Sequence, residues 1–131
     1  MREQAQNNKG PIRAGDVLDA SAASWTERTW EDRLEAGEAR AAFCDRAASH
    51  TLALVAQLGG KQPSSQQFLS HGTLQIWRAE FAWGWACCAS RGANFWLRAE
   101  EAGEPGARVE MNGPEAQWDS DAAEAFARAL L

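Results

Sequence analysis

The chain has no tyrosine and only three cysteines, two histidines and two methionines among its 131 residues. An odd number of cysteines without an export signal predicts reduced thiols in a cytoplasm rather than a disulfide framework. A structural zinc site needs four ligands at recognisable spacings such as C-x-x-C. Cys44, Cys87, Cys88, His50 and His71 show no such spacing, so we predict no metal and no cofactor.

Long apolar runs are also lacking. None approaches the roughly 20 residues that a membrane helix needs, and residues 1–15 hold no apolar signal-peptide segment. We therefore expect a cytoplasmic protein with no membrane contact, made of a flexible arm over residues 1–15 and one domain over residues 16–131. The abundance of alanine and arginine favours a bacterial source.

Recognisable catalytic motifs are absent too. The sequence has no Gly-rich phosphate loop, no G-x-S-x-G and no H-E-x-x-H. Cys87 or Cys88 with His71 is a formal nucleophilic pair, but a buried, unreactive thiol is the favoured interpretation. Glu80 lies beside Arg78, and simple solvent exposure accounts for that pair. We predict no catalytic residue, and a binding role is favoured over an enzyme.

The charge is uneven along the chain. The net charge is −5, and within residues 100–124 only Arg108 opposes a series of acids. An acidic protein repels phosphate groups, so nucleic acid is disfavoured as a partner. Solvated loops and a helix start explain most of these acids. The alternative is a negative surface for a basic protein partner, with Glu100, Glu101 and Glu104 as its candidate residues.

Helical signals dominate the first half. Ser24 and Glu27 fit a capping box, which predicts a helix with Trp25, Trp30 and Leu34 near one face. A second helix is predicted over residues 38–58, because apolar residues recur there at helical spacing before a Gly-Gly stop. Its predicted core stripe is Phe43, Ala47, His50, Leu54 and Leu58.

The second half changes to alternation. After a polar loop over residues 61–67, we predict a strand over 73–89 with a bulge or bend at Gly84. Further strands are predicted over 94–100 and 107–111, with a short fourth over 116–118. A last helix begins near Asp121, where Asp121 and Glu124 fit a capping box. The predicted fold is α+β: N-terminal helices packed on one face of an antiparallel three- to four-stranded meander, with a C-terminal helix.

Residues 81–88, FAWGWACC, form the most distinctive segment. On one continuous strand, Phe81, Trp83 and Trp85 would share a face, while the small residues at 82, 84 and 86 would line the other. The tryptophans are core if the long helix covers their side. They form an exposed site if the helix covers the small residues.

The sequence therefore predicts a small acidic accessory factor of the inhibitor, immunity or chaperone-like kind, which binds a protein partner or a second copy of itself. Its candidate sheet residues are Trp77, Trp83, Trp85 and Trp96. Exposed tryptophans are typical of protein interfaces, and pairing of two sheets would cover such a face. The alternative is a small-molecule-binding domain or enzyme with a Trp-lined pocket between sheet and helices.

Overall fold

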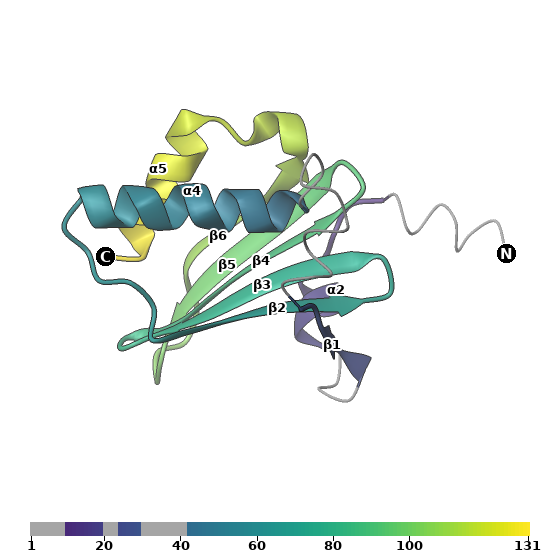
Figure 1. Ribbon diagram of the computed structural model, residues 1–131, viewed down its shortest axis with the longest axis horizontal. Helices are drawn as coiled ribbons and strands as arrows, with labels where there is room; N and C mark the ends of the chain where they lie inside the picture. The colour runs from purple at the N-terminus through teal and green to yellow at the C-terminus, as the bar shows by residue number, and fades with distance from the viewer. Residues whose placement is uncertain (1–9, 20–23, 30–41) are drawn as a thin grey trace, which may run out of the picture.

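Antiparallel hairpins build most of the molecule. The computed structural model describes residues 10–19, 24–29 and 42–131. Six strands form one sheet in chain order, β1 to β6, and each pairs antiparallel with the next (Figure 1). The strands are β1 (Thr26–Glu27), β2 (Ser65–His71), β3 (Leu74–Phe81), β4 (Gly84–Arg91), β5 (Asn94–Glu101) and β6 (Ala107–Pro114). The helices are α2 (Ala14–Leu18), α4 (Phe43–Gln57) and α5 (Ser120–Ala129).

The α+β class and the antiparallel meander are confirmed, but the predicted three to four strands are too few. β2 falls partly in the predicted polar loop, because Ser65, Gln66 and Gln67 are exposed and carry no apolar alternation. The predicted strand over 73–89 is two strands, β3 and β4. The predicted strand over 116–118 is instead a 3-10 turn, Glu115–Gln117.

The β3–β4 turn lies within the aromatic segment and overturns its reading as one strand. Phe81 pairs with Gly84, so Ala82 and Trp83 form a two-residue turn. Phe81, Trp83 and Trp85 therefore do not share one face. Alternation alone could not reveal this turn, since neither Ala82 nor Trp83 is a typical turn residue.

The sheet is covered on both faces. On one face Trp77, Ala86 and Leu97 pack against α4 and α5. On the opposite face, which we call the far face, Trp96 packs with Val17 of α2 and forms a second core. Figure 1 shows α4 and α5 on one side of the sheet and α2 on the other. The sequence patterns do not predict α2, and this short helix lies on the face opposite the long helix α4.

Small side chains let α4 lie against the sheet. Its buried positions recur every three or four residues, as a helix requires. His50, predicted in the core, is exposed, and Leu58 is 36% exposed. The buried stripe of α4 therefore differs from the predicted one. Cysteine, alanine and threonine side chains face the sheet, whereas Leu52 and Leu54 are only partly buried. The stripe consists of Phe43, Cys44, Asp45, Ala47, Ala48, Thr51 and Val55.

The N-terminal predictions are changed most. Thr26 and Glu27 pair with Ser70 and Leu69 of β2, so the predicted helix start is a strand. A local capping pattern is outweighed here by a long-range sheet edge that supplies backbone partners. Trp30 and Leu34 lie outside the described residues, as do residues 38–41 of the second predicted helix. Within the predicted arm, Ile12 is only 2% exposed, so that part is packed.

The C-terminal helix is confirmed, with an earlier cap. The Asp119 carboxylate accepts a hydrogen bond from the Ala122 N–H at 2.9 Å. Asp119 is therefore the residue that caps α5, rather than the predicted Asp121. α5 packs beside α4 and places Phe126 in the core between them and the sheet.

Candidate binding surfaces

Trp77 and Trp96 are both core residues, on opposite faces of the sheet. Each is 0% exposed. The Trp77 indole donates to Gln66 Oε1 at 2.9 Å, and the Trp96 indole donates to Glu110 Oε2 at 2.8 Å. Buried tryptophans usually find such acceptors. In this structure neither ring is available to a partner.

Trp83 sits in the β3–β4 turn and joins it to the end of α5. Its ring stacks on Phe81 with centroids 5.0 Å apart, and the Arg108 guanidinium lies 3.8 Å from the ring centroid. Its indole donates to Leu130 O at 3.2 Å. Trp83 therefore holds the end of the helical layer to the sheet.

Trp85 lies on the far face, partly buried. The Arg78 guanidinium covers its ring at 5.0 Å from the centroid, and Arg78 also pairs with Glu80 at 3.2 Å. The long helices do cover the small-residue side of β4, but this leaves no continuous aromatic face. The four predicted tryptophans are divided among two cores, a turn and a charged strip.

The predicted acidic surface is largely neutralised in space. Glu100 pairs with Arg98 at 2.7 Å, and Glu101 pairs with Arg108 at 3.5 Å. Glu104 is exposed in the β5–β6 turn. Glu110 pairs with Arg98 and Glu115 pairs with Arg46, two arginines that the fold brings near, and Glu124 pairs with Arg128 one turn later on α5.

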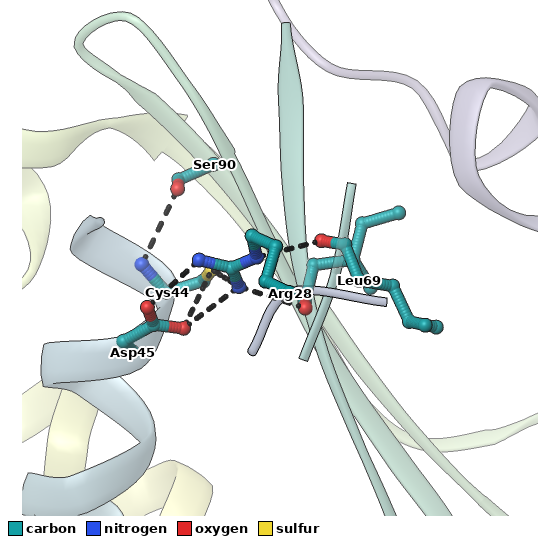
Figure 2. A network of polar contacts seen from close by, with 6 residues as sticks. Arg28, Cys44, Asp45, Leu69 and Ser90 are labelled. Carbon is teal, nitrogen blue, oxygen red and sulfur yellow. Dashed lines mark hydrogen bonds and ion pairs between the residues drawn. The ribbon is translucent and has the colours of Figure 1, made fainter. Parts of the chain in front are cut away.

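A buried ionic network, which the sequence did not reveal, joins β1 to α4. Arg28 donates two hydrogen bonds to the Asp45 carboxylate, both at 2.9 Å (Figure 2). It also donates to the carbonyls of Leu69 and Ile76, each at 3.1 Å. The two side chains are only 12% and 5% exposed. This network holds the start of α4 against the β2 side of the sheet.

The three thiols are buried and have raised pKa values. Burial raises the pKa of Cys44 and of Cys87 from 9.0 to about 12, and it raises that of Cys88 well above its ordinary value. Thiolates are the reactive form of cysteine, so these thiols are unreactive near neutral pH. The His71 imidazole hydrogen-bonds through Nδ1 to Ser24 O at 2.9 Å, not to a cysteine thiol.

These pKa values predict alkaline instability. Well below pH 9, the folded and unfolded thiols are nearly all protonated, so their ionisation does not change the free energy of unfolding. Between about pH 9 and pH 12, the unfolded chain releases these protons while the folded chain retains them. The free energy of unfolding should therefore fall as the pH rises through this range. The chain has no tyrosine to titrate there.

Urea titrations at several pH values would measure this loss. Replacing Cys87 with alanine should make the decline shallower, because one of the titrating groups is removed. A decline of unchanged steepness would contradict the assignment to the thiols. Native protein at pH 8 should also react with a thiol reagent only as fast as it unfolds.

An open groove of about 480 Å³ lies on the far face, beside β1 and β2. Its exposed rim includes Leu18, 43% exposed, and Trp25 forms a partly buried wall. Glu27 and Arg78 supply one charge of each sign. We call this the far-face groove, and its lining residues are Val17, Leu18, Trp25, Glu27, Gln67, Leu69, Arg78 and Cys87.

A second pocket of about 470 Å³ lies between the end of α4, the β3–β4 turn and the end of the chain. Phe81 and Trp83 contribute aromatic surface, and Leu131 is 46% exposed. We call it the turn pocket. Its remaining lining is Leu58, Gly59, Gly60, Lys61, Gln62, Ser64, Ala82 and Leu130.

Comparisons with known proteins assign no family. A scan of protein-family models finds no match, and searches of the curated proteins and of the solved structures also find none. Within the described segments, no group of histidine, cysteine and acidic side chains is arranged to hold a metal ion. No helix in those segments is long and apolar enough to cross a membrane.

Proposed function

We propose that the protein is a non-catalytic protein-binding factor and that the far-face groove is its contact site. The observation that carries this proposal is the groove itself, which combines an apolar wall with an exposed leucine at its rim. Grooves of this kind accept apolar anchor side chains from partner proteins. The contact thus moves from the predicted tryptophan face to residues beside it, because Trp77 and Trp96 are buried.

Charge favours a basic partner. The protein carries a net charge of −5, and Glu27 is exposed at the groove. Opposite charges raise association rates and discriminate between partners more than they add affinity. Binding through this site should therefore weaken as the salt concentration rises.

A matched pair of leucine variants tests the site. Displayed random linear peptides are selected on the wild-type protein, and the enriched peptides are then measured by fluorescence anisotropy. Leu18→Asp should abolish their binding, because it places a charge at the apolar rim. Leu131→Asp is the control, since that leucine is similarly exposed but lines the turn pocket. Equal binding by both variants would contradict the proposed site.

The turn pocket supports a second candidate, a small apolar ligand held between sheet and helices. Its lining includes three leucines and two aromatic residues, and its volume of about 470 Å³ suits a small molecule. The probe is the apolar dye ANS. Leu131→Asp is now the test variant, and Leu18→Asp is the control. Dye binding should be lost in Leu131→Asp and kept in Leu18→Asp, whereas loss in neither would exclude the pocket as its site.

A further inference from the structure

At two places in the fold, an arginine contacts both a tryptophan ring and a glutamate. The two sets are Arg78 with Trp85 and Glu80, and Arg108 with Trp83 and Glu101. The guanidinium lies 5.0 Å from the ring centroid and 3.2 Å from the carboxylate in the first set. The corresponding distances in the second set are 3.8 Å and 3.5 Å. A planar guanidinium can stack on an aromatic ring and still donate to a carboxylate.

Trp25 and Glu27 provide a ring and a carboxylate of the same kind in the far-face groove. They are two residues apart, a separation of roughly 7 Å along an extended chain, and both line the groove. Trp25 is partly buried and Glu27 is exposed. Within the described part of the chain, no arginine or lysine pairs with Glu27 or stacks on Trp25.

The neighbouring arginines are engaged elsewhere. Arg28, the next residue in the chain, donates two hydrogen bonds to Asp45 of α4. Arg78 lines the same groove, but its charge is balanced by Glu80. Among the described residues that line the groove, Glu27 is therefore the charge without an opposite partner. A cation from outside the chain would find both a carboxylate and an aromatic ring there.

We propose that the protein partner supplies an arginine, beside its apolar anchor residue, that stacks on Trp25 and pairs with Glu27. This rests on the proposed function and names the chemistry that the groove recognises. The aliphatic part of the arginine side chain would lie on the apolar wall of the groove, as such stems do on other apolar surfaces. The contact would complete a third set of the kind that Arg78 and Arg108 form within the chain.

A second copy of the chain is a poor source of this arginine. Two copies that each carry a net charge of −5 repel one another. Each described arginine except Arg13 already pairs with an acid of its own chain. Charge therefore favours a separate, basic protein as the occupant of the groove.

Glu27→Gln and Glu104→Gln form a matched pair of variants, because each removes one exposed carboxylate and one negative charge. Glu104 lies in the β5–β6 turn, outside the groove. For an arginine-containing peptide enriched in the selection above, Glu27→Gln should weaken binding about threefold to fivefold, as expected for an exposed ion pair. Glu104→Gln should bind like wild type. Equal binding by the two variants would overturn the arginine contact.

Replacing the peptide arginine with citrulline gives an independent test, because citrulline keeps the shape of the side chain and removes its charge. Binding to the wild-type protein should weaken about threefold to tenfold, since the ion pair and the cation–π contact are both lost. The loss should be smaller on Glu27→Gln, whose carboxylate is already gone. Equal losses on the two proteins would mean that the arginine does not contact Glu27, and the proposal would fail.

The selection itself separates this proposal from the proposed function. Enriched peptides that depend on Leu18 but contain no arginine would overturn the arginine contact and leave the groove function intact. Failure to enrich any Leu18-dependent peptide would overturn both. A dimer in light scattering that Glu27→Gln disperses and Glu104→Gln retains would assign the site to a second copy and overturn the proposed partner.

Discussion

Replacing Arg28 with alanine should lower the free energy of unfolding by about 3–5 kcal/mol. The guanidinium is the bidentate partner of Asp45, whose side chain is only 5% exposed. Without it, the buried Asp45 carboxylate loses two charged hydrogen bonds, and the Leu69 and Ile76 carbonyls each lose a donor. Urea unfolding at neutral pH measures the loss.

An exposed pair supplies the control. Arg128 and Glu124 are 2.8 Å apart on α5, with side chains 58% and 51% exposed. Such pairs contribute at most about 1 kcal/mol, so Arg128→Ala should change stability little. Arg28→Lys should be intermediate, because an ammonium cannot reproduce the bidentate geometry. If Arg28→Ala cost no more than Arg128→Ala, the buried network would not be holding α4 to the sheet.

Local sequence patterns predict the helices and strands whose conformation depends mainly on their own residues. The long helix was recognisable from its apolar spacing and Gly-Gly stop, and the meander was recognisable from alternation and turns. Ser65, Gln66 and Gln67 carry no apolar alternation, so the sequence alone predicts a loop for the first part of β2. Its strand conformation comes from pairing with β3, and residues 65–71 lie opposite residues 74–80. Edge strands of this kind depend on their neighbours rather than on intrinsic preference.

The candidate sites depend even more on distant contacts. Arg28 and Asp45 are 17 residues apart in the sequence. The sequence also predicts a helix around Arg28, and residues of such a helix would not pair with β2. The far-face groove is lined by residues of α2, β1, β2, β3 and β4. Composition did point to the tryptophans, but their exposure depends on which side chains cover each face. Val17 of α2 is one such residue, and it packs in the core that buries Trp96.

Gly84 is the residue of the aromatic segment where the structure allows least change. It begins β4 directly after the Ala82–Trp83 turn and lies opposite Glu101 of β5. A Cβ placed there would stand 2.9 Å from Glu101 Cα and 3.0 Å from Ala102 N, and closer still to the Glu100 carbonyl oxygen. These are backbone atoms, fixed further by the hydrogen bond from Ala102 N to Trp83 O at 2.8 Å.

Gly84→Ala should therefore cost about 3 kcal/mol of stability, at the upper end for an added methyl in a packed site. Gly15→Ala is the control, since the nearest atom to its Cβ is Asp19 Oδ2 at 3.1 Å, at the end of an exposed side chain. Side-chain ends can shift more easily than a paired backbone, so its cost should be clearly smaller. Urea unfolding of both variants measures the difference. If the two variants lost equal stability, β4 and β5 could move apart at this point without a cost in stability. The close approach of the β5 backbone would then not explain why residue 84 is a glycine.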